Sequence, residues 1–224
     1  MANNAKRPTI PLDMGGVLTK MAHQRPVFHS EADFQHAFAW EVHRQVPDAS
    51  IRLEKPLTTI AGVAHLDVLI QREGATVAVE LKYKTKKLTH QITDEAYNLR
   101  SHGAQDLGRY DFMKDIGRLE DISASFPSTV GCAVLLTNES SYWRNPLSSK
   151  TVDAAFRLHE GRVLSGEATW GAGASKGTMK SREKPIKLRG SYKLEWHDYS
   201  ALQTNKDLVF RYLLVAVPSY RIKQ

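Results

Sequence analysis

Apolar positions recur with a helical period in the segment that follows the first 27 residues. Phe34, Phe38 and Val42 lie four residues apart, which places them on one face of a helix. Ser30 precedes this pattern, and Asp33 stands three positions later, the spacing of a capping box. The pattern therefore predicts an amphipathic helix from Ser30 to about Val46.

The pattern then changes to alternation with a period of two. Residues 49–57, 65–71 and 75–83 alternate apolar and polar positions and are rich in β-branched residues, as strands are. Glu73 and Gly74 lie between the second and third of these segments. Two strands joined by so short a turn form a β-hairpin, which we predict over residues 65–83.

The rest of the chain gives a less regular pattern. A polar segment, 83–104, includes a candidate short helix at 92–100, and a clear amphipathic helix is predicted at 104–125. Residues 128–138 are apolar on both faces, which predicts a central strand. A third helix at 148–161, a Gly- and Lys/Arg-rich loop at 165–190 and strands at 192–199 and 208–217 complete the chain.

These elements follow the order α-β-β-β-α-β and then α-β-β. The order predicts a fold of the α/β class. Its sheet is expected to be mixed, as in α+β proteins, with helices on its faces. Residues 1–27 are rich in Pro and Gly and are expected to form an N-terminal arm. Residues 28–224 are expected to form a single domain, with a core at about 30–137 and an extension at about 138–224.

Composition narrows the class of protein. The chain is 42% hydrophobic and 25% charged, which is typical of a globular protein. A single cysteine, Cys132, excludes an intrachain disulfide. Because no apolar run approaches about 18 residues and no secretory signal is evident, we expect a cytoplasmic protein without a membrane partner. The net charge of +7 favours a polyanionic partner such as nucleic acid.

Polar residues interrupt the hairpin at positions that a buried strand would fill with apolar ones. Alternation places Asp67 on one face of its strand, and Glu80 and Lys82 on one face of the next. A regular turn at Glu73-Gly74 would place Asp67 opposite Glu80, and His65 opposite Lys82. Like charges directly opposite each other are destabilising. A divalent cation held by both carboxylates would offset the repulsion, and ligation by oxygen suits Mg²⁺ or Mn²⁺. The alternative is a polar stripe that faces solvent.

The sequence Asp67, twelve residues, then Glu80-Leu81-Lys82 resembles the signature of the PD-(D/E)XK nuclease superfamily. The predicted order of elements over about 30–137 is also similar to its restriction-endonuclease-like core, although Leu66 stands where that family often has proline. The resemblance implies metal-dependent hydrolysis of phosphodiester bonds. In that mechanism Asp67 and Glu80 would bind Mg²⁺ or Mn²⁺, and Lys82 would assist catalysis.

The family often adds a glutamate from the first helix. Glu31 is the favoured candidate both for metal binding and for catalysis, because the first turn of the helix is expected at the same end of the hairpin as Asp67 and Glu80. As an alternative, Glu31 would only complement the helix dipole. Glu41 is a reserve candidate that better suits a structural ion pair.

Two basic segments could contact a phosphate backbone. One follows the hairpin and the other lies in the Gly-rich loop, and their predicted nucleic-acid-binding residues are Lys84, Lys86, Lys87, Lys176, Lys180, Arg182 and Lys184. The alternative for the loop is a solvated surface segment. Arg109, Lys114 and Arg118 of the helix at 104–125 could also face nucleic acid, but ion pairs within that helix explain them better.

The sequence therefore predicts a Mg²⁺- or Mn²⁺-dependent nuclease that acts on DNA, in DNA processing or in defence against foreign DNA, and as a homodimer if it cuts both strands. Two alternatives stay open. The chain could be a catalytically inactive nucleic-acid-binding module of the same fold, or a subunit whose basic loop binds an acidic partner. The intact set of Asp67, Glu80 and Lys82 favours the enzyme.

Overall fold

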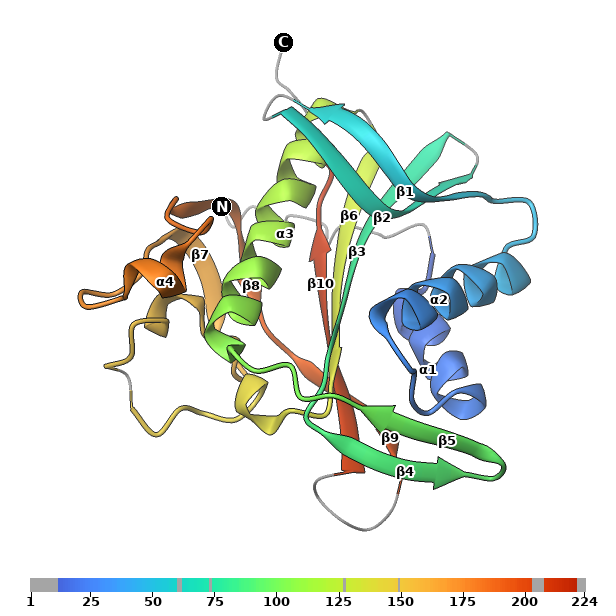
Figure 1. Cartoon of the computed structure of the whole chain (residues 1–224). Coiled ribbons are helices and arrows are strands. Elements are labelled where there is room, and N and C mark those ends of the chain that lie inside the picture. The colour runs from blue at the N-terminus through green and yellow to red at the C-terminus, as the bar shows by residue number, and fades with distance from the viewer. Residues whose placement is uncertain are drawn as a thin grey trace, which may run out of the picture.

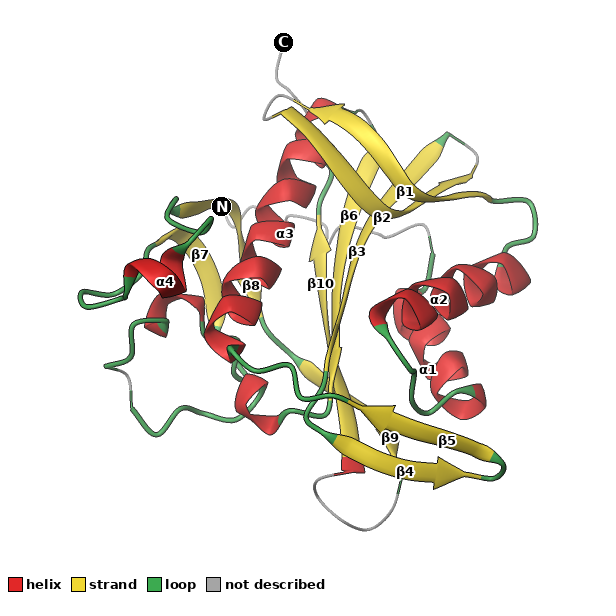
Figure 2. Cartoon of the chain, viewed as in Figure 1, coloured by secondary structure: helices red, strands yellow, loops and turns green. Residues whose placement is uncertain are grey.

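The computed structural model describes residues 12–59, 62–72, 74–126, 128–148, 150–202 and 208–220. They form an α+β fold around a mixed six-stranded sheet (Figures 1 and 2). The strands lie in the order β1 (Ser50–Thr59), β2 (Gly62–Arg72), β3 (Ala75–Lys84), β6 (Thr129–Thr137), β10 (Val209–Val217) and β9 (Trp196–Ala201). Among these six described strands, β3 and β6 pair in parallel and the other neighbouring pairs are antiparallel.

Helix α2 (Glu31–Gln45) confirms the first predicted helix and its start. The Ser30 side chain accepts a hydrogen bond from the Asp33 backbone N–H at 3.1 Å, as a helix N-cap does. Phe34, Phe38 and Val42 are fully buried against the sheet. The apolar period of the sequence thus marks the face that α2 packs on β2 and β3.

Helix α1 (Met14–Gln24) shows that the prediction of an N-terminal arm over residues 1–27 was wrong for its second half. Asp13 caps the helix by accepting from the Gly16 N–H at 2.9 Å, and Val17 and Leu18 have no exposed surface. Gly15 and Gly16 lower the helix propensity of this segment, and for that reason the sequence did not predict the helix. Residues 1–11 lie outside the described part of the chain.

Helix α3 (Gln105–Ser125) covers the opposite face of the sheet from α1 and α2 (Figure 1). It confirms the second predicted helix, with Met113, Ile116 and Leu119 buried and Lys114 exposed. Because it connects the parallel strands β3 and β6, it serves as the crossover that such a pair requires. Among the described residues, no helix is long and apolar enough to span a bilayer.

Strand β6 is buried along its whole length between β3 and β10, as its two apolar faces predicted. Burial raises the pKa of the Cys132 thiol to about 12, so this side chain is an inert part of the core.

The β2–β3 register confirms the predicted hairpin but ends early. Val68 pairs with Val79 and Ile70 with Val77, as predicted, although Glu73 itself lies outside the described residues. The pairing stops at Val68, so Asp67 and Glu80 lie just beyond the ladder. The predicted opposition of His65 and Lys82 was wrong, because the ladder between β2 and β3 ends at Val68, three residues after His65 in the chain.

The strict alternation predicted for β2 also breaks at this point. Leu66 belongs to the same apolar cluster as Leu69, whereas Val68 and Ile70 belong to the cluster on the other face of the sheet. In β1 the regular pairing skips Glu54, which has a left-handed φ of 51°. This local irregularity accompanies the separation of β2 from β3.

Three further predictions were wrong in the connecting segments. Residues 92–100 form no helix and instead complete a hairpin of β4 (Leu88–Ile92) and β5 (Glu95–Leu99). The buried residues Tyr97 and Leu99 lie two apart, which is the period of a strand.

The predicted helix at 148–161 has only one short 3₁₀ turn, Ala154–Phe156, preceded along the chain by another at Ser140–Tyr142. The loop predicted at 165–190 instead contains the end of β7 (Val163–Ala168), the short helix α4 (Lys176–Met179) and most of β8 (Ile186–Lys193). Strands β7 and β8 pair with each other, and the strand predicted at 192–199 is divided between β8 and β9. Packing of β8 against α3 stabilises this region, which the local sequence does not reveal.

Substitution of Gly131 tests how closely α3 approaches the sheet. An added Cβ at Gly131 would lie 2.8 Å from the Leu119 Cβ and 2.9 Å from the Val217 Cβ. We expect Gly131→Ala to lower the free energy of unfolding by about 1–3 kcal/mol, because the core must shift to admit the methyl group. Urea denaturation measures this change.

Gly103→Ala is the matched control, since nothing lies within 4 Å of its added Cβ. This exposed substitution should change the free energy of unfolding by less than about 0.5 kcal/mol. Equal effects of the two substitutions would contradict the close packing of α3 on β6.

Candidate functional site

The candidate site lies where β2 and β3 separate. The Asp67 Oδ2 atom accepts a hydrogen bond from the Leu81 backbone N–H at 2.6 Å. Two residues further along β3, the Tyr83 N–H donates to Glu31 Oε2 at 2.8 Å. Two carboxylates, one from β2 and one from α2, thus satisfy backbone donors of β3 beyond the last ladder pair with β2.

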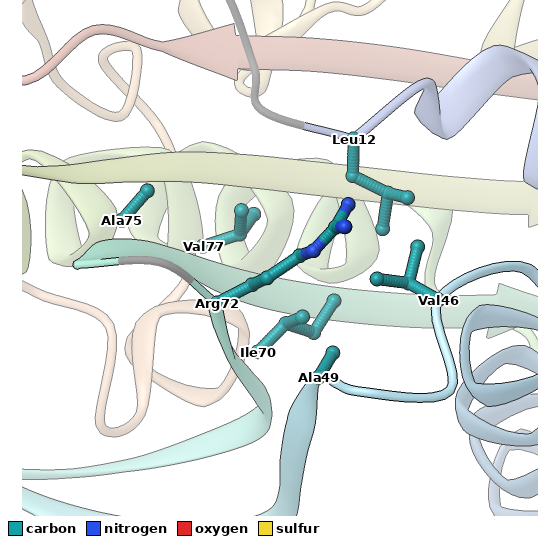
Figure 3. A pocket seen from close by; sticks show the side chains of 7 residues that line it. All are labelled: Leu12, Val46, Ala49, Ile70, Arg72, Ala75 and Val77. Carbon is teal, nitrogen blue, oxygen red and sulfur yellow. The ribbon is translucent and has the colours of Figure 1, made fainter.

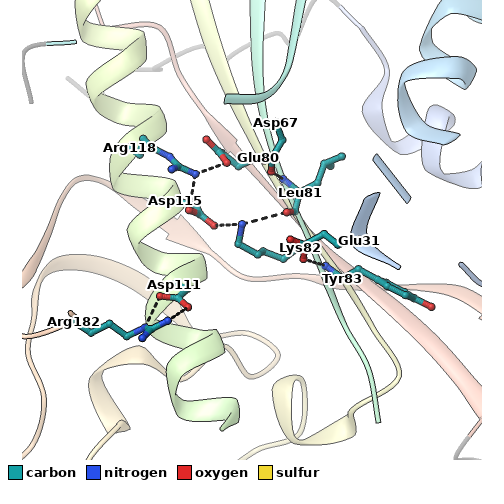
Figure 4. A network of polar contacts seen from close by, with 10 residues as sticks. All are labelled: Glu31, Asp67, Glu80, Leu81, Lys82, Tyr83, Asp111, Asp115, Arg118 and Arg182. Carbon is teal, nitrogen blue, oxygen red and sulfur yellow. Dashed lines mark hydrogen bonds and ion pairs between the residues drawn. The ribbon is translucent and has the colours of Figure 1, made fainter. Parts of the chain in front are cut away.

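A row of alternating charges connects β3 to α3 (Figure 4). Arg118 Nη2 lies 2.5 Å from Glu80 Oε2 and 2.9 Å from Asp115 Oδ1. Asp115 Oδ2 lies 3.1 Å from Lys82 Nζ, and the ammonium also donates to the Leu81 carbonyl at 3.3 Å. Because Glu80 and Lys82 alternate with apolar residues on β3, both side chains point to the face that α3 covers.

This site is buried more deeply than a surface polar cluster. The side chains of Glu80 and Asp115 are 1% and 8% exposed, and that of Lys82 is 17% exposed. Arg118 is the most open member, with 30% of its side chain exposed. Loss of hydration at such depth is costly, so each charge depends on its neighbours.

Burial also shifts the proton affinities of the acids. It raises the pKa of Glu80 well above its usual range, and the nearby Asp115 carboxylate adds to the rise, whereas Arg118 opposes it. Burial raises the pKa of Asp67 and of Asp115 as well.

At Lys82, burial and the neighbouring charges shift the pKa in opposite directions. Burial alone would lower its pKa, but the carboxylates of Asp115, Asp67, Glu31 and Glu80 more than compensate and raise it. Lys82 therefore stays protonated at neutral pH.

The two acids of the hairpin offer oxygen donors that suit a hard divalent cation. Glu80 Oε1 is buried and accepts no hydrogen bond from the described residues. The Asp67 carboxyl lies close enough to Glu80 to influence its pKa directly, and either a shared proton or a cation would satisfy the pair. An oxygen-only donor set of this kind suits Mg²⁺ or Mn²⁺.

Glu31 does not join Asp67 and Glu80 in one ligand set. Within the described ranges, no group of three or more His, Cys, Asp or Glu side chains is placed to hold a metal ion. Glu31 instead binds the Tyr83 N–H, although its charge still acts on Lys82 and Asp67. The reserve candidate, Glu41, accepts from Gln45 and Arg44 inside α2, which confirms the expected structural role.

Asp115 and Arg118 are the site residues that the sequence reasoning missed. The expected ion pair within the helix is present, because Arg118 and Asp115 are three residues apart in α3. The same Arg118 nitrogen also binds Glu80 on β3, which no local pattern could show. The available signal was an acid, Asp115, between the buried residues Met113 and Ile116.

The predicted basic residues separate into different surroundings. Lys84 ends β3, whereas Lys86 and Lys87 follow it at the surface. Lys176 and Lys180 are exposed at α4. Arg182 makes two 2.7 Å bonds to the Asp111 carboxylate of α3 and thereby attaches this segment to the helix (Figure 4).

Lys184 lines a groove of about 740 Å³ beside α3, and Arg118 lines the same groove. A different cavity lies on the α2 side of the sheet and is surrounded by Leu12, Val46, Ala49, Ile70, Arg72, Ala75 and Val77 (Figure 3). Its volume of about 20 Å³ is enough for roughly one water molecule. The groove is therefore the opening that adjoins the candidate site.

Comparisons of this chain with protein-family models, with curated proteins and with solved structures find no match. Its function is therefore inferred from the residues of the chain itself.

The raised pKa of Glu80 predicts a pH-dependent cost of keeping this acid buried. The folded state holds the proton more tightly than the unfolded state, so ionisation of Glu80 removes stability as pH rises from about 4.5 through the folded-state pKa. Glu80→Gln cannot ionise and should avoid this loss. The variant should therefore gain stability relative to the wild type as pH rises from 5 to 8.

Urea denaturation of both proteins across this pH range measures the difference. Glu41→Gln serves as control because Glu41 is also buried but lies outside the site, where it accepts from Arg44 and Gln45 within α2. A stability difference between Glu80→Gln and the wild type that does not change with pH would contradict the assigned burial effect.

Proposed function

We propose that this chain is a Mg²⁺- or Mn²⁺-dependent deoxyribonuclease of the PD-(D/E)XK type with a restriction-endonuclease-like core. The observation that carries the proposal is the convergence of Asp67, Glu80 and Lys82 where β2 and β3 separate, with one Glu80 oxygen buried and without a hydrogen-bond donor among the described residues. The order α2-β1-β2-β3-α3-β6, in which the β4–β5 hairpin is inserted before α3 and strands β3 and β6 are parallel, supports the same core.

Burial favours this proposal over a solvent-facing polar stripe. A stripe of the latter kind would expose its charges, whereas Glu80 is 1% exposed and Lys82 is 17% exposed. Buried acids with raised pKa values beside a protonated lysine are typical of catalytic sites, because stability alone would favour apolar residues there.

Each residue has a role that its contacts suggest. Asp67 and Glu80 would hold the divalent cation, which when bound polarises the phosphoryl oxygens and lowers the pKa of a bound water. Because Lys82 stays protonated, it cannot accept a proton, so it would stabilise negative charge that develops on the phosphoryl group.

Two further residues act through others. Asp115 is a positioning residue that holds the Lys82 ammonium from α3. Glu31 is a positioning residue that fixes the end of β3 through the Tyr83 N–H, rather than a ligand.

A second candidate function is nucleic-acid binding without turnover. It is favoured by one observation, the contact of Arg118 with Glu80, since a guanidinium neutralises this carboxylate without any metal. In that case the buried acids would only maintain the fold that presents the basic surface.

Substitution of Glu80 separates the two functions. Supercoiled plasmid, linear duplex and single-stranded DNA are incubated with Mg²⁺, Mn²⁺ or EDTA. We expect metal-dependent cleavage by the wild type and a loss of roughly 100-fold or more in Glu80→Gln, because the cation loses a charged ligand. Glu41→Gln, which changes a buried acid outside the site, should keep the wild-type rate.

Equal rates in the two Glu→Gln variants would rule out Glu80 as part of a catalytic site. Salt-dependent DNA binding by the wild type, without cleavage in any condition, would establish the second candidate instead.

Removal of the Lys82 ammonium tests its catalytic role. We expect Lys82→Ala to fold and to bind DNA but to reduce the cleavage rate at saturating DNA by roughly 100-fold or more. Lys84→Ala, two residues further on the same strand, should weaken DNA binding and leave the saturated rate unchanged. A saturated rate that survives in Lys82→Ala would remove Lys82 from the mechanism.

A further inference from the structure

The groove beside α3 has a strongly basic lining. The lining includes Lys114 and Arg118 of α3, Lys184 just before β8 and Lys187 at the start of β8. It also includes His65 of β2, which lies two residues from Asp67. The groove thus extends from the surface to the candidate site.

The acids that line the groove are already engaged. Asp121 pairs with Arg189 at 2.6 Å, and the Glu183 carboxylate accepts from the Ser181 N–H at 3.0 Å. In the described part of the chain, the ammonium groups of Lys114, Lys184 and Lys187 have no hydrogen bond or ion pair. These cations are consequently available to an anion that enters the groove.

Arg118 belongs both to this groove and to the buried acids. A single nitrogen, Nη2, serves Glu80 and Asp115 together, and Nε is buried without a hydrogen-bond acceptor among the described residues. The arrangement is not the two-nitrogen fork in which arginine binds a carboxylate or a phosphate most strongly. Since 30% of the side chain is exposed, the guanidinium has donors left for an anion in the groove.

We propose that the groove binds the phosphate backbone of nucleic acid and that Arg118 exchanges Glu80 for a backbone phosphate as it binds. The exchange leaves the buried Glu80 carboxylate without its cationic partner and so makes it a stronger ligand for a divalent cation. This inference rests on the proposed function, because it assigns the cation to Asp67 and Glu80. It makes Arg118 the residue that couples binding of the strand to binding of the metal.

Coupling of this kind is reciprocal and can be measured without cleavage. Isothermal titration calorimetry with Ca²⁺, another cation that prefers oxygen ligands, compares the protein alone with the protein saturated by a short DNA oligonucleotide, single-stranded or duplex. Gel analysis afterwards verifies that the oligonucleotide is intact. We expect the oligonucleotide to tighten Ca²⁺ binding by about fivefold or more. If neither the single-stranded nor the duplex oligonucleotide changes the Ca²⁺ affinity, the proposed exchange is overturned.

Arg118→Gln tests the residue itself. In EDTA, the variant should bind the oligonucleotide about tenfold more weakly by fluorescence anisotropy, because it loses a charged phosphate contact. Its Ca²⁺ affinity without DNA should not fall, and the effect of DNA on that affinity should disappear. A merely structural role would change thermal stability but leave the coupling intact, and that result would overturn the assignment.

Lys187→Gln tests the groove independently of the buried acids. It should reduce the salt dependence of oligonucleotide binding by about one in log–log slope, as the loss of one phosphate contact does. Lys20→Gln makes the same change of charge at an exposed position on α1, across the sheet, and should leave the slope unchanged. Equal slopes for the two variants would overturn the assignment of the groove.

The outcomes distinguish this inference from the proposed function. Metal-dependent cleavage with no coupling between DNA and Ca²⁺ would reject the exchange alone. Oligonucleotide binding that depends on Arg118 and Lys187, without cleavage, would reject hydrolysis and retain the groove.

Discussion

The separation of β2 from β3 is the constraint on which the site depends. Beyond Val68 and Val79 the two strands no longer share backbone hydrogen bonds, yet the donors of β3 still require acceptors. Asp67 and Glu31 supply them from side chains, at Leu81 and Tyr83. The Asp67 carboxylate is therefore fixed by the backbone of the strand that carries Glu80 and Lys82.

The two faces of the sheet serve different purposes at this point. On one face, α1 and α2 bury an apolar core that reaches from Leu18 to Phe38 and holds the sheet in place. On the other face, α3 packs its apolar residues beside a row of buried charges that begins at Glu80 and ends at Lys82. Because α3 is also the crossover between β3 and β6, the chain brings this helix over the charged end of β3 without a further element.

The buried charges of the site lower the stability of the fold and leave polar groups that a ligand could satisfy. The pKa values of the buried Glu80 and Asp115 and of the half-buried Asp67 are raised, and one Glu80 oxygen remains without a hydrogen-bond donor in the described part of the chain. Apolar residues of the same volume would cost less to bury. Such an arrangement is explained if a ligand completes it, and the basic groove that reaches Arg118 indicates a ligand with negative charge.

Elements whose patterns are local could be predicted from the order of the amino acids alone. The period of Phe34, Phe38 and Val42 fixed a helix and its buried face, the two apolar faces of residues 128–138 fixed a central strand, and a two-residue period with a short turn fixed the register of Val68 with Val79. The same alternation selected Asp67, Glu80 and Lys82. Patterns of this kind are readable because each residue's partners lie a few positions away or directly across a turn.

The partners of these three residues follow from packing between distant parts of the chain. Arg118 and Asp115 are separated from β3 by more than thirty residues, and their ion pair within α3 accounts for them fully when the sequence is considered alone. The position of β8, the helical part of the supposed arm and the engagement of Glu31 with Tyr83 likewise depend on packing between distant segments. Charge interactions of this kind are strong because the groups are buried, and burial depends on the folded chain as a whole.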